Sequence, residues 1–185
     1  CSNIITHDKN HLFQFATYQN NCPIIKEAKF FAKKHKVNIN IGSLLLKIKK
    51  NKKLANRSIL INKEGKIQSI YNKIHLFDVN INTRETNRES HSFIKGDKII
   101  MNKVDGVNIG LTICYDLRFP DLYRQLAKKG AQILLIQAAF TVPTGKAHWE
   151  TLIRARAIEN SVFLEDESRN LAKPNPQSLI RAMTG

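Results

Sequence analysis

Cys114 is the residue of this sequence whose type and position are best suited to covalent chemistry. It ends a stretch of alternating apolar residues at 107–113, and Phe119-Pro120 shortly after it is typical of a helix start. The alternation places Cys114 on the face opposite the apolar side chains. A thiol at a strand-to-helix junction lies beside free backbone N–H groups, which suits a nucleophile that forms an acyl intermediate. The alternative is a buried structural thiol, because free cysteine is among the most buried residue types.

Other patterns built on cysteine and histidine are not supported. Cys1, Cys22 and Cys114 form no CxxC pair and have no histidine at zinc-finger spacing, so neither a disulfide framework nor a structural zinc site is predicted. His75 and His148 invite a Cys-His dyad, but their local sequences favour packed or capping histidines. No phosphate-binding glycine loop or metal-ligand cluster is present, so we predict no nucleotide, metal or other cofactor.

The elements that must position Cys114 follow from periodicity and turn signals. Helices are expected at 23–35, 119–129 and 146–160, the first with one face formed by Ile24, Ala28, Phe31, Ala32 and His35. A strand is expected at 37–48, and hairpins are expected from 56–62 with 66–73 and from 99–104 with 107–114. The continuous apolar run at 131–140 predicts a strand covered on both faces. Helices interleaved with strands predict a layered α/β fold.

Length and charge limit the class of protein. The 185 residues suffice for one domain with a substantial core, and there is no run of roughly 18 or more apolar residues and no signal pattern. We therefore expect a cytoplasmic protein that does not enter membranes. The net charge of +15 is spread over the chain, and its densest stretch, 47–53, falls between two predicted strands. We interpret the lysines as solvated surface and not as a nucleic-acid groove.

Four stretches, taken in order, carry a resemblance to a known family: YNKIHLFD at 71–78, RESHSFIKGD at 88–97, GLTICYDLRFPDLYR at 110–124 and AAFTVPTGKAHWETLIRARAIEN at 138–160. Together they resemble the nitrilase superfamily of carbon–nitrogen hydrolases, and within it the amidase branch that includes ω-amidase and deaminated glutathione amidase. The resemblance implies a four-layer α-β-β-α sandwich, incomplete at both ends, that assembles as a homodimer or larger homo-oligomer. Residues 1–164 would be a partial carbon–nitrogen hydrolase domain, and 165–185 a divergent, loosely ordered tail.

The resemblance also implies roles for individual residues. Cys114 would be the nucleophile, Lys73 the triad lysine, and Glu89 the additional active-site glutamate near both. Attack of the sulfur on an amide carbon would give an oxyanion held by the Lys73 ammonium and the Tyr115 backbone N–H. A thioester would form as ammonia leaves, and water would then release the acid. The residues implied to line the substrate pocket are Tyr115, Arg118, Phe140 and Thr141.

The substrate implied by these residues is a small amide. Arg118 with hydroxyls nearby suits a substrate that bears a distal carboxylate, since arginine binds carboxylates through two hydrogen bonds. The alternative for Arg118 is a salt bridge with Asp116 or Asp121. Whether the cleaved bond is an amide, nitrile or carbamoyl C–N bond stays open. A structural role is expected for four residues further along the chain: Trp149, Arg154, Arg156 and Glu159.

Two parts of the family pattern have no counterpart here. The family's general-base glutamate lies in a Pro-Glu motif ahead of the first helix, and Glu27, the first glutamate of this chain, lies inside the helix predicted at 23–35. No family-like strand is expected after Asn160. The resemblance therefore implies an amidase that is impaired in this chain alone, and the alternative is an inactive truncated homologue or a basic binding protein.

Overall fold

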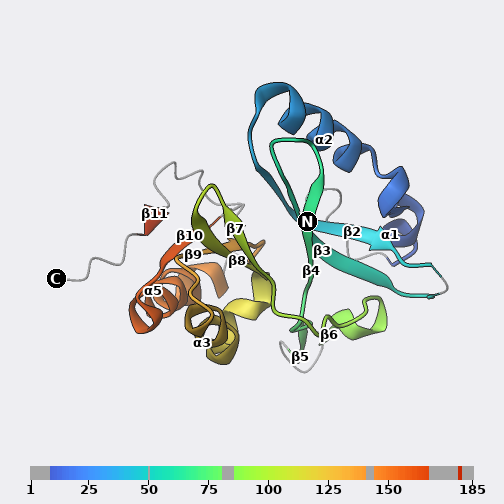
Figure 1. The fold of residues 1–185 in the computed structure, drawn as a ribbon. Helices are drawn as coiled ribbons and strands as arrows, with labels where there is room; N and C mark the ends of the chain where they lie inside the picture. Colours follow the sequence, from blue (N-terminus) through green and yellow to red (C-terminus); the bar gives the residue numbers. More distant parts are fainter. Residues whose placement is uncertain (1–8, 50, 81–85, 141–143, 167–178, 181–185) are drawn as a thin grey trace. The chain divides into compact units, whose positions relative to one another are not determined.

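The chain folds into two compact units, Cys1–Lys98 and Ile99–Gly185. The structure, a computed structural model, describes residues 9–49, 51–80, 86–140, 144–166 and 179–180. Each unit contains a β-sheet and helices, and Figure 1 shows both. The predicted α/β class is confirmed.

The sheet of the first unit has the strand order β1-β2-β3-β4. β1 (Thr17–Tyr18) is parallel to β2 (Ile39–Lys47), whereas β3 (Leu54–Ile61) and β4 (Ile67–Asn72) add antiparallel strands and confirm the first predicted hairpin. A second, smaller sheet pairs β5 (Asp78–Asn80) with β6 (Thr86–Arg88). The helical elements are α1 (Lys9–Phe15), a 3-10 turn η1 (Gln19–Asn21), α2 (Pro23–His35) and a 3-10 turn η2 (Glu89–His91).

Helix α2 has the predicted bounds, but only Ala28 and Ala32 of the predicted face pack against the sheet. Ile25 and Ala32 are buried, and Ala32 packs with strand residues such as Leu44 in one hydrophobic cluster. Ile24 and Phe31, which the sequence placed on the buried face, are 36% and 49% exposed. The helix carries adjacent apolar pairs at 24–25 and 30–31, so it has two apolar stripes, and only packing decides which one meets the sheet.

The sheet of the second unit has the order β11-β10-β9-β8-β7. β7 (Met101–Val104) and β8 (Val107–Ile113) form the second predicted hairpin, and β8 leads directly into the 3-10 helix η3 (Cys114–Arg118). β9 (Ile133–Gln137) lies parallel to β8, and α3 (Pro120–Lys128) connects them. A π-helical turn, η4 (Gly145–Trp149), continues into α5 (Glu150–Asn160), so the helix predicted at 146–160 is confirmed with an irregular first turn.

Strand β8 is covered on both faces near its carboxyl end, which differs from the one-sided pattern of its sequence. Leu111 and Ile113 are fully buried, and so is Thr112 on the opposite face. A Cβ added at Gly110 would lie 3.0 Å from the Leu126 side chain, so glycine at 110 allows α3 to approach the sheet closely. The polar character of this face therefore does not mean contact with water.

The expectation that no strand follows Asn160 is wrong. β10 (Phe163–Asp166) pairs in parallel with β9, and β11 (Leu179–Ile180) pairs antiparallel with β10. The strand is short, and Ser161, which has a φ of 52°, ends α5 directly before it. Val162 and Leu164 are buried, and the segment is too brief for its alternation to stand out in the sequence.

Candidate active site

Cys114 sits at a strained turn. It is the first residue of η3, directly after β8, and its φ is 49°. The left-handed region costs a non-glycine residue roughly 1–2 kcal/mol, and residues held there concentrate at functional sites. Its thiol is free and partly exposed, whereas the free thiol of Cys22 is buried in the core of the first unit. Of these two cysteines, Cys22 fits the structural reading and Cys114 does not.

Two buried polar side chains hold this turn from either end. The Asp116 carboxylate accepts a hydrogen bond from the Ile113 N–H at 2.9 Å, one residue before the cysteine. Arg156 in α5 donates from Nε to the Leu117 carbonyl oxygen at 3.0 Å. Asp116 is fully buried and Arg156 is 7% exposed, so both bonds are shielded from water. The strained conformation of the cysteine is therefore imposed by its surroundings.

A buried tyrosine supports the same region from α3. Thr112 Oγ1 donates to the Leu135 carbonyl at 2.9 Å, so the Tyr123 hydroxyl, 2.9 Å from the same Oγ1, is the donor in their bond. Burial raises the pKa of Tyr123 well above its ordinary value. The Arg156 guanidinium lies 5.8 Å from the Tyr123 ring centroid, which links α3 and α5.

The first unit places Lys73 against Glu89. Lys73 Nζ lies 2.6 Å from Glu89 Oε2, and their side chains are only 4% and 12% exposed. Lys73 follows β4 directly, and its N–H donates to the Asn56 carbonyl while its own carbonyl accepts from the Gly96 N–H. A Cβ at Gly96 would collide with the Asn72 carbonyl, so the backbone on this side of Lys73 requires glycine.

Glu89 has further hydrogen-bond donors besides the lysine. The Phe77 N–H donates to Glu89 Oε2 at 2.6 Å, and Asn56 Nδ2 lies 3.5 Å from Oε1. Ser43 donates to Asn56 Oδ1 at 2.7 Å, which turns the amide nitrogen toward the glutamate. The carboxylate is therefore built into a buried polar network in which ion pairing and hydrogen bonds offset the cost of burial.

Arg118 contacts two residues near the start of the last predicted helix. Its Nη2 lies 3.1 Å from His148 Nδ1, and its guanidinium lies 5.7 Å from the Phe140 ring centroid. Phe140 in turn contacts Trp149, with 4.6 Å between ring centroids. Because arginine can only donate, His148 accepts through Nδ1 and carries its proton on Nε2. The packed or capping role expected for His148 is wrong, since it is exposed and bonded to Arg118.

The remaining predicted site residues fall as follows. Tyr115 is partly exposed in η3 and contacts Phe119, with ring centroids 5.4 Å apart. Thr141 lies outside the described residues. Lys73 and Glu89 belong to the first unit, and Cys114 belongs to the second.

Arg156 and Glu159 form an ion pair of 2.9 Å, and Trp149 is 8% exposed, as expected for structural residues. Arg154 instead pairs with Glu150 at the surface.

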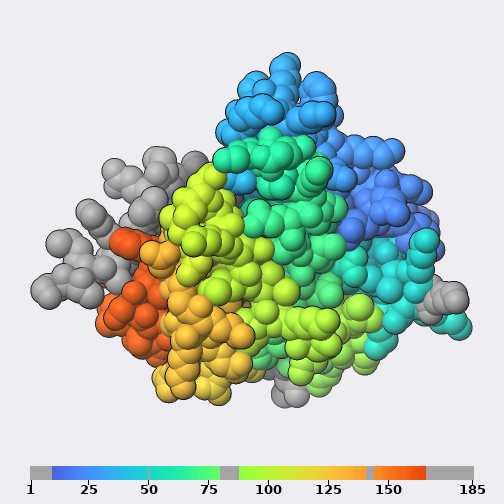
Figure 2. Space-filling model, viewed as in Figure 1, coloured from blue at the N-terminus to red at the C-terminus, as the bar shows by residue number. Residues whose placement is uncertain are grey.

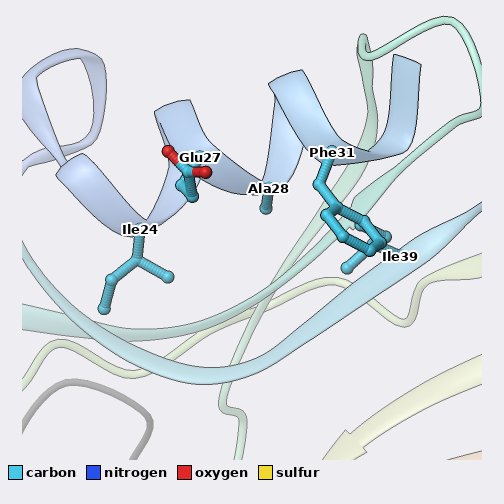
Figure 3. A pocket seen from close by; sticks show the side chains of 5 residues that line it. All are labelled: Ile24, Glu27, Ala28, Phe31 and Ile39. Carbon is cyan, nitrogen blue, oxygen red and sulfur yellow. The ribbon is translucent and has the colours of Figure 1, made fainter. Parts of the chain in front are cut away.

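An open groove of about 360 Å³ lies elsewhere, on the exposed stripe of α2. Its lining is Ile24, Glu27, Ala28, Phe31 and Ile39, none of which is a predicted site residue (Figure 3). The α2 side chains form part of the surface in the space-filling view (Figure 2).

Among the described residues no helix is long and apolar enough to cross a membrane. Within the same ranges, His, Cys, Asp and Glu form no group of three suited to a metal ion.

Sequence reasoning did not find several polar residues of these networks. Asp116 lies three residues after Ile113, the spacing at which an acidic side chain accepts from the N–H of the residue that precedes a helical turn, so that signal was present. Gln137, a buried residue outside these networks, interrupts an apolar run and could have been noticed in the same way. Asn56 and Ser43 lie in two strands and have no local signal, because only the pairing of β2 with β3 brings them together.

Comparison with known proteins relates most of the chain to one family. A family model described as carbon–nitrogen hydrolase matches residues 2–169. A deaminated glutathione amidase from Yersinia enterocolitica is 39% identical over 151 residues, which cover 80% of this chain and 53% of the relative. One from Synechocystis is 45% identical over 114 residues, covering 60% of this chain and 42% of the relative.

Solved structures show the same fold. The crystal structure of the Caenorhabditis elegans NitFhit protein has a TM-score of 0.85 and 34% identity, and the match covers 97% of this chain and 43% of that one. The Saccharomyces cerevisiae Nit3 structure, a member of the nitrilase superfamily, has a TM-score of 0.76 and 28% identity, covering 90% and 60%. The chain spans about half the length of the curated relatives it matches.

Proposed function

The chain belongs to the carbon–nitrogen hydrolase family, and from this premise we propose that it is an amidase that forms a thioester on Cys114. In this reaction the sulfur bonds to the carbonyl carbon of a small amide, the C–N bond breaks, and the nitrogen takes up a proton and leaves as ammonia. Water then adds its hydroxyl to the acyl carbon, the C–S bond breaks and the sulfur regains a proton. The relatives named deaminated glutathione amidase favour an amide as the substrate.

The observation that carries this proposal is the conformation of Cys114. A free, partly exposed thiol is held at a φ of 49° by buried polar partners on both sides. A residue that served only to fill space would not need such a turn, since its side chain could pack equally well from an unstrained backbone. The backbone N–H of Tyr115, the residue after Cys114, is the donor that we propose for the oxyanion.

Lys73 and Glu89 complete the proposed machinery. The Lys73 ammonium, paired with a carboxylate at 2.6 Å, would supply a positive charge that stabilises both a thiolate and the oxyanion. Glu89 keeps two further hydrogen bonds and so holds the ammonium in place.

The proposed substrate bears a carboxylate at some distance from its amide. Arg118 lies four residues after Cys114 in one 3-10 helix, which places the two residues about 8 Å apart along its axis. His148, which accepts from Arg118 through Nδ1, offers its Nε2–H to the same anion. Both groups would recognise a carboxylate separated from the reacting carbon by a short chain.

Two measurements test the amidase proposal. The first is ammonia release from a panel of primary amides with and without a distal carboxylate. The second is mass spectrometry of the intact protein, which detects an acyl group on Cys114 even when the second half-reaction is slow. Cys114→Ala should abolish both signals and leave the far-ultraviolet circular dichroism unchanged. A folded protein that releases no ammonia and acquires no acyl group from any amide would refute the proposal.

The carboxylate preference is tested by Arg118→Met. This variant should raise KM for amides with a distal carboxylate by about tenfold, the value of one charged hydrogen bond. The KM for neutral amides of equal length should not change. An equal effect on both kinds of amide would contradict a role in carboxylate binding. The predicted homo-oligomer stays a prediction, to be checked by the mass of the protein in solution.

A further inference from the structure

Gln137 is a buried amide for which the described part of the chain offers no hydrogen-bond partner. It is 5% exposed, and neither Nε2 nor Oε1 has a partner among the described residues. Leaving a buried donor and a buried acceptor unpaired is costly, and such a group in a native fold calls for an explanation. A leucine or methionine would fill the same space in this apolar run without that cost.

The position of Gln137 relates it to the nucleophile within the same unit. Gln137 is the last residue of β9 and pairs in register with Ile113, the residue directly before Cys114. Neighbouring strands lie about 4.8 Å apart, so the glutamine belongs to the immediate surroundings of the cysteine turn. The φ of 49° at Cys114 ends the regular alternation of faces there. The carboxyl ends of parallel strands are also where α/β sheets bind ligands.

The two unpaired atoms specify the chemistry of a partner. Gln137 Nε2 needs an acceptor and Gln137 Oε1 needs a donor. A single partner can satisfy both atoms only if its acceptor and its donor lie side by side. A primary carboxamide has this arrangement, because its carbonyl oxygen and the N–H on the same side share one edge. A nitrile offers only an acceptor, and an ionised carboxylate offers two acceptors, so each would leave Oε1 unpaired or repelled.

We infer that Gln137 binds the carboxamide group of the substrate, with Nε2 donating to its carbonyl oxygen and Oε1 accepting from its nitrogen. This inference rests on the proposed function and makes it more specific. It selects amides and carbamoyl compounds, which share the –CO–NH2 edge, over nitriles. The stability that the protein loses by burying this unpaired amide is then explained by the amide's role in binding the substrate.

The experiment compares two reagents at the same sulfur. Acrylamide carries a primary carboxamide and acrylonitrile a nitrile, and both add the Cys114 sulfur to their terminal carbon while a proton from water goes to the neighbouring carbon. The two rate constants are measured by mass spectrometry of the Cys114 peptide and divided by those of a small free thiol. The normalised acrylamide-to-acrylonitrile ratio reports recognition of the carboxamide and does not depend on turnover.

The variants are chosen to separate binding from stability. Gln137→Met should lower the normalised ratio by about tenfold and raise the thermal unfolding midpoint by about 2–4 °C, because a buried unpaired group is removed. Asn102→Leu is the matched control: Asn102 is 7% exposed, its Nδ2 is also unpaired within the described part of the chain, and it lies in β7 opposite Ile109. It should raise the midpoint in the same way and leave the ratio unchanged.

An unchanged ratio in Gln137→Met, or an equal fall in Asn102→Leu, would overturn the inference. Gln137→Glu provides a second check, since it keeps the shape but offers acceptors only, and it should lower the ratio as Gln137→Met does. The proposed function fails differently. Absence of ammonia release and of an acyl group on Cys114, together with a high normalised ratio, would refute the amidase and leave carboxamide binding by Gln137 in place.

Discussion

The buried ion pair between Lys73 and Glu89 makes a prediction whose size follows from its geometry. Lys73→Met removes the ammonium and leaves a carboxylate that is only 12% exposed. Removing one partner of a buried pair costs about 3–5 kcal/mol. Glu89 keeps the Phe77 N–H at 2.6 Å and Asn56 Nδ2 at 3.5 Å, so we expect the lower end, about 3 kcal/mol. Glu89→Gln should cost a similar amount, because it leaves the buried lysine ammonium without the negative charge of Glu89.

The double variant Lys73→Met/Glu89→Gln tests whether the stability lost in each single variant comes from an unpaired buried charge. It removes both charges but keeps a side-chain oxygen for the Phe77 N–H, and replacing a whole buried pair is often close to neutral. The double variant should therefore be more stable than either single variant. Urea unfolding followed by circular dichroism measures this, with a midpoint shift of about 1.5 M for each single variant if the slope is about 2 kcal/mol per M.

The reasoning is refuted if the double variant loses as much stability as the two single variants together, since the two side chains would then contribute independently. A single variant that is unfolded outright does not obscure the test, because recovery of a cooperative transition in the double variant is itself the predicted result. Both single variants and the double variant should form no acyl group on Cys114 in the mass-spectrometric assay.

Three further predictions concern the cysteine turn. Asp116→Ala leaves the Ile113 N–H without its acceptor and should cost roughly 2 kcal/mol in urea unfolding; an equal loss in Asp116→Asn, which retains an oxygen, would contradict this reason. Burial raises the pKa of Tyr123, so the unfolded chain releases the phenol proton first as the pH rises. The contribution of the neutral, buried phenol to the free energy of unfolding is therefore complete below pH 10.0, the ordinary pKa of tyrosine. Above that pH the contribution declines by up to about 1.4 kcal/mol per pH unit. Tyr123→Phe should remove that component from the slope of unfolding free energy against pH, and identical slopes would disprove it. Cys114→Gly should be about 1 kcal/mol more stable than Cys114→Ala by thermal unfolding, because glycine tolerates a φ of 49°; an alanine variant of equal stability would show that the turn is unstrained.

Local sequence signals were sufficient for most of the elements. Pro23 and Pro120 start α2 and α3 as expected, since proline suits the first helical turn. The Asp105-Gly106 turn joins β7 to β8, where both residues have positive φ. These features depend on residues close together in the chain, and so they can be predicted without knowledge of the rest of the fold.

Elements whose identity depends on packing were harder to predict. The buried stripe of α2, the short strand β10 and the coverage of both faces of β8 all required the neighbouring element to be in place. The role of His148 was misread for the same reason, because its partner Arg118 is 30 residues away in the chain.

By its sequence alone, this protein could be related to a carbon–nitrogen hydrolase, because the motifs around Lys73, Glu89 and Cys114 are local strings of residues. Only the tertiary structure decided how these residues are held. It joined Lys73 to Glu89 across a separation of 16 residues, and it fixed the turn of Cys114 with Arg156 from α5. It also showed that the Gln137 amide is buried and unpaired within the described residues. Burial, ion pairing and an unpaired amide are properties of three-dimensional surroundings, which is why no local pattern of residue types could reveal them.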